Sequence, residues 1–313
     1  MCIKRLNYKY GNMFSNLKNF LYTLPKQVLS VLQFLRSIIS KMFGDPSISA
    51  KIHGQKLYMP LSHNLPIYVN RFKFYDTALT RISKFLRLDK KNLVYIDVGA
   101  NIGDSILAIN PKKKDVIIAI EPNPKFQKYL RKNLVNLNNI VIKEVMCSSS
   151  PKKEKVKILE KNGTASIVVD NESMEIEQDT LDNIMKENKL GQIDLLKVDT
   201  DGHDFDVLNG AKKTIKKYKP AIFFECDSFG NKNYANDIFE LFDFLKSCGY
   251  MSIIMYDNFG YLFGKYNLED KETLENFFFY QLNSNFYYFD ILVMDENKSK
   301  RFFALEKKAL LLS

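Results

Sequence analysis

The feature that most constrains this chain is a buried-strand pattern that stops at a glycine-rich turn. Residues 93–98 form an apolar, β-branched run that contains Asp97, and Gly99 and Gly103 follow it. Such a run predicts a buried parallel strand, and the turn after it opens a helix at 104–110. Ligands of doubly wound α/β folds bind beyond the carboxyl ends of their strands, so the turn predicts a ligand site.

The kind of ligand follows from the next strand and from the glycine spacing. Residues 115–120 predict a second strand, and Glu121 at its end lies 24 positions after Asp97, where a carboxylate suits the two hydroxyls of a ribose. A pyrophosphate binder requires G-x-G-x-x-G, whereas this turn reads G-x-x-x-G and has no Lys or Arg before Pro111. A nucleoside without phosphates, S-adenosylmethionine above all, fits better. A turn that serves only helix–strand packing is the alternative interpretation.

Strands and helices alternate along the rest of the chain. Strands are predicted at 139–146, 193–198, 220–224, 251–256 and 289–295. Helical patterns lie between them at 124–138, 204–218 and 234–247, and a β-hairpin is predicted at 155–169, turning at Asn162-Gly163. This alternation predicts an α/β, Rossmann-like fold, which is a mostly parallel sheet with right-handed crossovers and helices on both faces.

Five motifs, taken in order, resemble the FkbM family of methyltransferases. They are Asp-Val-Gly-Ala-Asn-Ile-Gly at 97–103, Ile-Glu-Pro-Asn-Pro at 120–124, Asp-Thr-Leu-Asp at 179–182, Leu-Lys-Val-Asp-Thr-Asp-Gly at 196–202 and Phe-Phe-Glu at 223–225. The resemblance implies a class I fold with seven strands and an antiparallel last pair, S-adenosylmethionine as cofactor, and methyl transfer to an oxygen. Family members often act in pathways for polysaccharides, lipid-linked glycans or polyketides. The family more often has Glu where this chain has Asp201, which shortens the reach of that carboxylate by about one methylene.

The resemblance also implies which residues hold the cofactor. The methionine part is expected on the glycine turn, at Asp97, Gly99, Ala100, Asn101 and Gly103. Glu121 is expected at the ribose hydroxyls, and Met146 and Cys147 are expected beside the adenine.

Polar residues crowd the end of the predicted strand 193–198, where catalysis is expected. A sugar hydroxyl is a poor nucleophile while protonated, so a general base is expected here among Asp199, Asp201 and His203. His203 is the first choice, because a neutral imidazole accepts protons near pH 7, and Asp201 is the second. Glu225 is expected to orient the acceptor hydroxyls. The plainer alternatives are a solvent-facing helix start for His203 and a loop tie for Asp199.

Charge and cysteine content narrow the class of protein. The net charge is +10, but residues 1–44 hold seven Lys or Arg and no Asp or Glu, which leaves only +3 for the rest. No nucleic-acid surface is expected on the catalytic domain, and lysine runs such as 112–114 and 212–219 are expected to be solvated. Four cysteines without paired spacing indicate a reducing cytosol, and no zinc site is expected, since His53 and His63 lack zinc-ligand spacing. No other metal site is expected, but a divalent ion held by the carboxylates after 193–198, where it would clamp two substrate oxygens, stays open as an alternative.

The N-terminal residues predict a basic amphipathic helix. Apolar residues recur at helical spacing between Val28 and Met42, interrupted by Arg36 and Lys41, so the segment is too broken for a transmembrane helix and lacks a signal-peptide pattern. Two interpretations stay open. The helix lies on the inner face of an anionic membrane as a peripheral contact of a cytoplasmic protein, or it docks on the catalytic domain or a second subunit.

The expected organisation is an N-terminal extension at 1–49, a cap or lid at 50–92, the methyltransferase domain at 93–296 and a loosely held tail at 297–313. The expected function is O-methylation of a sugar hydroxyl in a glycan, polysaccharide or lipid-linked saccharide. An N-methyltransferase, or a non-catalytic cofactor-binding module in a membrane-associated glycan assembly complex, is the alternative. The oligomeric state stays open.

Overall fold

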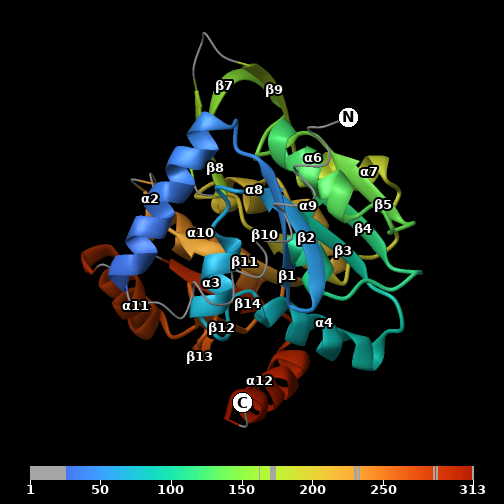
Figure 1. Cartoon of the computed structure of the whole chain (residues 1–313). Coiled ribbons are helices and arrows are strands. Elements are labelled where there is room, and N and C mark those ends of the chain that lie inside the picture. The colour runs from blue at the N-terminus through green and yellow to red at the C-terminus, as the bar shows by residue number, and fades with distance from the viewer. Residues whose placement is uncertain are drawn as a thin grey trace.

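The central sheet has eight strands, which run in the order β13-β12-β14-β11-β10-β3-β4-β5 (Figure 1). The computed structural model describes residues 26–161, 163–169, 174–228, 231, 233–284, 286 and 288–311. The strands are β3 (Val94–Val98), β4 (Val116–Ile120), β5 (Ile140–Lys143), β10 (Leu195–Val198), β11 (Ala221–Asp227), β12 (Ser252–Asp257), β13 (Leu262–Asn267) and β14 (Tyr288–Val293).

The predicted fold class is confirmed, with one strand more than expected. β3 pairs in parallel with both β4 and β10, and β14 runs antiparallel between β11 and β12, which gives the antiparallel last pair. The eighth strand, β13, pairs antiparallel with β12 at the sheet edge. Gly264 and mostly half-exposed side chains interrupt its apolar alternation, so the sequence pattern did not reveal it.

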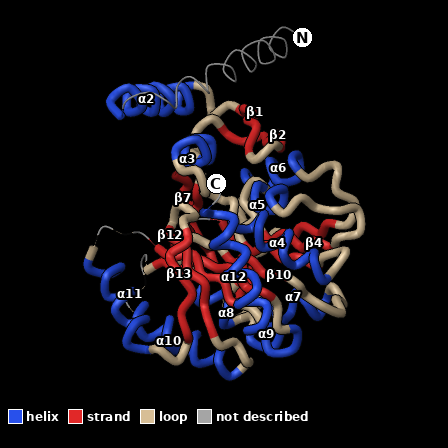
Figure 2. Tube along the Cα trace, turned by 90° about the horizontal axis from the view of Figure 1, so that it is seen from below, coloured by secondary structure: helices blue, strands red, loops and turns tan. Residues whose placement is uncertain are grey.

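Helices cover both faces of the sheet (Figure 2). One core contains residues of α7 (Leu181–Glu187), α8 (Asp204–Asn209), α9 (Lys212–Tyr218), α10 (Tyr234–Ser247) and α11 (Lys271–Asn283). The core on the other face contains residues of α4 (Ala78–Asp89), α5 (Asp104–Ala108), α6 (Pro124–Asn133) and α12 (Glu296–Leu311). A sheet buried on both faces explains why its strands read as continuous apolar runs.

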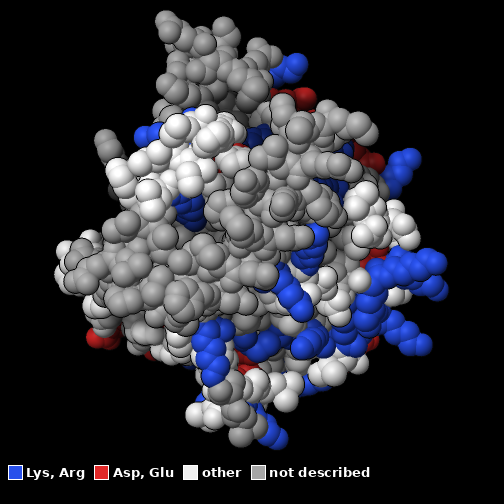
Figure 3. All heavy atoms as spheres, in the orientation of Figure 1, with Lys and Arg blue, Asp and Glu red and all other residues white. Residues whose placement is uncertain are grey.

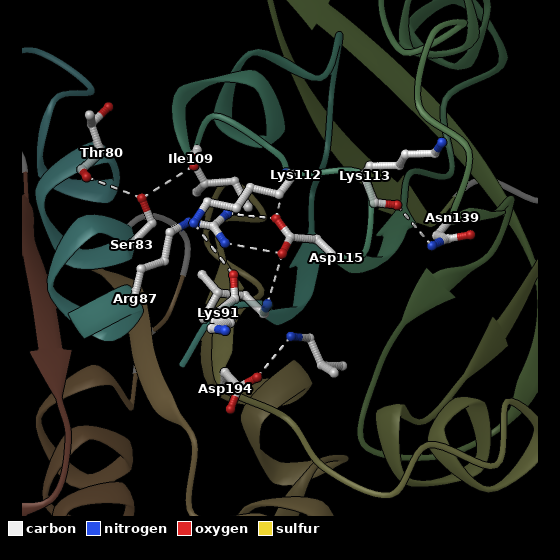
Figure 4. Close-up of polar contacts among 12 residues, drawn as sticks. Thr80, Ser83, Arg87, Lys91, Ile109, Lys112, Lys113, Asp115, Asn139 and Asp194 are labelled. Carbon is white, nitrogen blue, oxygen red and sulfur yellow. Dashed lines mark hydrogen bonds and ion pairs between the residues drawn. The ribbon is translucent and has the colours of Figure 1, made fainter. Parts of the chain in front are cut away.

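Two carboxylates tie the amino ends of the central strands together (Figure 4). The buried Asp115 accepts hydrogen bonds from the Arg87 guanidinium at 3.0 and 2.6 Å and from the backbone N–H of Leu93 at 2.8 Å. Asp194 accepts from the backbone N–H of Val94 at 2.8 Å. These contacts fix the loops at the amino ends of the strands. The polar side chains at the carboxyl ends are thus separate from this network.

The predicted strand 139–146 and helix 204–218 are each broken in the structure. After β5 the chain enters a second sheet of order β6-β9-β7-β8, formed by β6 (Met146–Cys147), β7 (Lys152–Lys161), β8 (Thr164–Val169) and β9 (Met174–Asp179). The predicted hairpin is confirmed, because β7 and β8 pair antiparallel with Lys161 opposite Thr164. The helix breaks at Gly210, where a Cβ would collide with the carbonyl oxygen of Ser148.

The N-terminal segment packs on the catalytic domain. It consists of α2 (Lys26–Met42), a hairpin of β1 (Ser47–Ile52) and β2 (Gln55–Pro60), and α3 (Leu65–Arg71). The hairpin shares a core with Ile102 and Phe126, and Arg36 of α2 donates hydrogen bonds to the carbonyl of His63 and the side chain of Asn64. These contacts of α2 therefore reach the predicted cap segment at 50–92, and the two interpretations of this helix stay predictions.

The tail predicted to be loosely held is instead a packed helix. α12 carries Glu306, which is only 1% exposed, pairs with Arg81 at 2.8 Å and accepts from the Tyr256 hydroxyl at 2.9 Å. The amphipathic pattern was correct, but the sequence did not show that its one buried carboxylate had partners in α4 and β12.

The surface carries its basic residues as the sequence predicted. The side chains of Lys112, Lys113, Lys114, Lys212 and Lys213 are all exposed. Figure 3 shows the face of the molecule that is turned to the viewer in Figure 1, and Lys and Arg side chains gather on its right and lower side. In the part of the chain that the structure describes, no helix is long and apolar enough to cross a membrane.

Candidate active site

A cavity of about 520 Å³ opens at the carboxyl edge of the sheet. Nine of the twelve predicted site residues line it: Gly99, Asn101, Glu121, Met146, Cys147, Asp199, Asp201, His203 and Glu225. The other three, Asp97, Ala100 and Gly103, are buried and do not line the cavity. The cofactor and catalytic sets predicted from separate strand ends thus meet at one place.

The glycine turn is shaped by a close approach between two strand ends. Gly99 has φ +80°, and a Cβ there would collide with the carbonyl oxygen of Asp199. The backbone N–H groups of Gly99 and Ala100 both donate to the carbonyl of Ile120 at 3.0 Å. Glycine is required here because both the backbone angle and the space exclude a side chain.

Glu121 is a buried carboxylate held by the backbone. It is 5% exposed, and its Oε2 and Oε1 accept from the backbone N–H groups of Asn101 and Asn123, each at 2.8 Å. Burial raises the pKa of Glu121 to about 7, although these two hydrogen bonds oppose the rise. Each oxygen keeps a second acceptor direction, which suits the two hydroxyls of a ribose.

Lys197 is a site residue that the sequence analysis did not single out. It is 7% exposed, and its Nζ lies 2.8 Å from Asp199 Oδ2 and 3.5 Å from Asp97 Oδ1. Burial alone would lower the pKa of Lys197, but the two carboxylates outweigh it and hold the pKa well above its usual value. The sequence could have indicated this role, because a lysine inside an apolar strand is buried and therefore requires a charged partner.

The loop after β10 contains His203, which lines the cavity, and Asp204, whose side chain stabilises the loop by hydrogen bonds. The Asp204 Oδ2 accepts from the backbone N–H and the hydroxyl of Thr200, at 3.2 and 3.0 Å. Burial, followed by the nearby charge of Asp199, raises the pKa of Asp204 to about 7. His203 occupies the N-cap position of α8 without a capping bond from its side chain and lines the cavity. Asp204 therefore ties the loop together, and His203 is placed at the cavity wall.

The far wall of the cavity is rich in carboxyl groups and aromatic rings. Burial, reinforced by neighbouring carboxylates, raises the pKa of Glu225 and Asp76 well above their usual values, which favours their neutral forms. Phe72, which precedes α4, stacks on Phe259 at 3.8 Å between ring centroids. No group of three or more His, Cys, Asp or Glu among the described residues is arranged to hold a metal ion.

These features define a class I, S-adenosylmethionine-type methyltransferase fold. Residues 97–251, just under half of the chain, match the family model of the methyltransferase FkbM domain. The resemblance seen in the sequence is thereby confirmed. S-adenosylmethionine is the methyl donor of this class of domain.

Solved structures with a similar fold include several methyltransferases. Methyltransferase FkbM from Methylobacillus flagellatus KT is 14% identical with a TM-score of 0.39, over 62% of this chain and 55% of that one, so this chain spans about half its length. A precorrin-6y C5,15-methyltransferase from Geobacter metallireducens GS-15 is 14% identical (TM-score 0.36; 69% and 87% covered). M. jannaschii TYW2 in complex with AdoMet is 15% identical (TM-score 0.37; 80% and 86% covered). No curated protein sequence matches the chain.

The close packing of Gly99 against the carbonyl of Asp199 leads to a prediction about stability, and Gly54 serves as its control. Gly99→Ala should destabilise the fold by about 3 kcal/mol or more, because it adds a collision to an unfavourable backbone angle. Gly54→Ala should cost only about 1 kcal/mol, because Gly54 has φ +85° but nothing within 4 Å of a Cβ. Chemical denaturation measures both variants, and equal losses of stability would show that the approach to Asp199 does not constrain the turn.

Proposed function

We propose that the protein is an S-adenosylmethionine-dependent O-methyltransferase that methylates a hydroxyl of a sugar in a glycan, polysaccharide or lipid-linked saccharide. The observation that carries the proposal is one cavity in which the pinned carboxylate of Glu121 and the polar loop after β10 lie together. The first suits a nucleoside, and the second suits proton transfer beside it.

The residues of the cavity fit the cofactor. Glu121 supplies two acceptor directions for the ribose, and Gly99 and Asn101 of the glycine turn line the cavity beside it, where the methionine part is proposed to lie. Met146 and Cys147 are buried in an apolar wall that suits an adenine. Burial raises the pKa of the Cys147 thiol, so this cysteine stays neutral and acts as a wall.

When bound, S-adenosylmethionine supplies a methyl group that its sulfonium already activates. The chain then has to place the acceptor hydroxyl and accept its proton. Placement can contribute about 7–11 kcal/mol, and a general base about 10²–10⁴-fold. His203 is the proposed base, with Asp201 as the second candidate, and Lys197 holds the Asp199 carboxylate in place beside them.

A sugar acceptor is supported by the far wall. Tyr68, Phe72 and Phe259 offer aromatic faces, and Glu225 and Asp227 offer hydrogen-bonding carboxyl groups. Aromatic faces with polar groups at their edges suit the two kinds of surface on a sugar ring. Methyl transfer to an amine is the second candidate, because the same carboxyl groups would accept hydrogen bonds from the N–H groups of a neutral amine. Paired glucoside and glucosaminide acceptors separate the two.

Cofactor binding is the first test. Calorimetric titration should show binding of S-adenosylmethionine but not NAD, and Glu121→Ala should weaken it by about 10- to 100-fold, since hydrogen bonds to a charged group are lost. The pKa of Glu121 is about 7, so its carboxylate form, the better acceptor, grows as the pH rises from about 6 to about 8. Wild-type affinity should rise over this range. Absence of binding to folded protein would overturn the proposal.

The base is tested by His203→Gln. Turnover should fall by about 10²–10⁴-fold while the affinity for S-adenosylmethionine is unchanged, because the imidazole acts only on the acceptor proton. His53→Asn, in the β1–β2 turn, is the control and should leave turnover unchanged. Full turnover by His203→Gln would remove His203 as base and leave Asp201.

We also propose that residues 1–44 contact an anionic membrane surface from the cytoplasmic side. These residues carry seven basic and no acidic side chains, and Phe34, Leu35, Met42 and Phe43 are exposed although Arg36 bonds the helix to the residues just before α3. A basic segment with exposed apolar side chains binds anionic lipid surfaces. Such a contact would bring a lipid-linked acceptor close to the cavity.

Vesicle sedimentation tests this contact. Full-length protein should bind phosphatidylglycerol vesicles in a salt-sensitive manner and phosphatidylcholine vesicles hardly at all. Phe43→Ser should weaken binding by about tenfold, and Phe279→Ser should not, although both rings are 68% exposed. Equal effects of the two variants, or no binding, would contradict a specific membrane contact through this segment.

A further inference from the structure

His63 belongs to the N-terminal segment, yet its ring lies beside the glycine turn. It is 7% exposed and lines the cavity together with Asn101 and Gly163. These three residues come from the start of α3, the turn after β3 and the turn of the β7–β8 hairpin. Three segments far apart in the sequence therefore meet around one imidazole.

The hydrogen bonds around His63 are consistent with a single tautomer of its ring. Its Nδ1 accepts from the backbone N–H of Leu65 at 3.2 Å, so the proton of the neutral ring is assigned to Nε2. Nε2 lies 3.4 Å from Asn101 Oδ1 and donates to it, and Asn101 Nδ2 donates to the carbonyl of Gly163 at 2.8 Å. Burial lowers the pKa of His63 to about 4, which agrees with a neutral ring.

The hairpin presses its backbone against the imidazole. Gly163 has φ +102°, and a Cβ there would lie 2.7 Å from Cγ and Nδ1 of His63. Phe126 meets the ring edge-on at 6.3 Å between centroids. With neighbours on these sides and both nitrogens bonded, the ring has a single orientation.

Asn101 connects this ring to the cofactor side of the cavity. It has φ +48°, an uncommon conformation for a residue with a side chain, and its backbone N–H donates to Glu121 Oε2 at 2.8 Å. Asn adopts this conformation more readily than most residues, and contacts that fix its side chain stabilise it further. The bonds from His63 and to Gly163 fix this side chain, so they help to hold the peptide that orients Glu121.

We propose that His63 is a positioning residue for cofactor binding: it fixes the Asn101 side chain, joins the hairpin to the glycine turn, and so holds Glu121 in place for the ribose. The inference rests on the proposed function, because it assumes that S-adenosylmethionine binds at this turn. It gives the N-terminal segment, which lies outside the residues matched by the family model, a direct part in the cofactor site.

The test measures S-adenosylmethionine affinity by calorimetry beside thermal stability, using the full chain. His63→Phe keeps a ring and removes both hydrogen bonds, and should weaken binding by about 2- to 12-fold. His63→Gln retains an N–H donor for Asn101 and should restore most of that loss. Asn101→Gly keeps the backbone angle and removes the same link. Its effect should not add to that of His63→Phe in the double variant.

The outcomes separate the two proposals. Wild-type protein that fails to bind S-adenosylmethionine overturns the proposed function, and this inference with it. Wild-type protein that binds, with His63→Phe binding equally well, overturns this inference alone, even if the variant melts at a lower temperature. If His63→Phe does not fold, Asn101→Gly decides, since unchanged affinity in that variant also overturns the link.

Discussion

The ammonium group of Lys197 lies between the carboxylates of Asp97 and Asp199, and the floor of the cavity depends on it. These carboxylates belong to adjacent strand ends, at the point where Gly99 packs against the backbone of residue 199. Without a cation the buried Asp97 carboxylate and the partly exposed Asp199 carboxylate would repel each other. One buried lysine therefore allows the glycine turn and the loop after β10 to lie in direct contact.

The cavity above this floor is assembled from parts with separate origins. The sheet supplies the cofactor turn and the polar loop, the N-terminal segment supplies His63 and Phe72, and the inserted hairpin supplies Gly163. Close backbone approaches at Gly99 and Gly163, and a side-chain hydrogen bond from Asn101 to Gly163, join these parts. Such contacts restrict which residues can occupy these positions.

The local patterns in the sequence were sufficient for the main strands, the hairpin and the location of the candidate residues. Glycine spacing and apolar runs are local properties, and they identified the turn and Glu121. Contacts between distant segments are not local. The break at Gly210, the buried Lys197 and the contact of His63 with Asn101 each depend on a partner that the pattern around the residue does not name. β13 was missed because Gly264 interrupts its alternation.

The order of the strands has a consequence for how such a chain can be divided. The family match ends at residue 251, but β14, near the end of the chain, occupies the place between β11 and β12. A fragment that stops there would leave β11 with an open edge and its Phe223 and Phe224 uncovered. The stretch that matches the family model is thus shorter than the smallest fragment that can be exchanged between proteins or expressed as a folded unit.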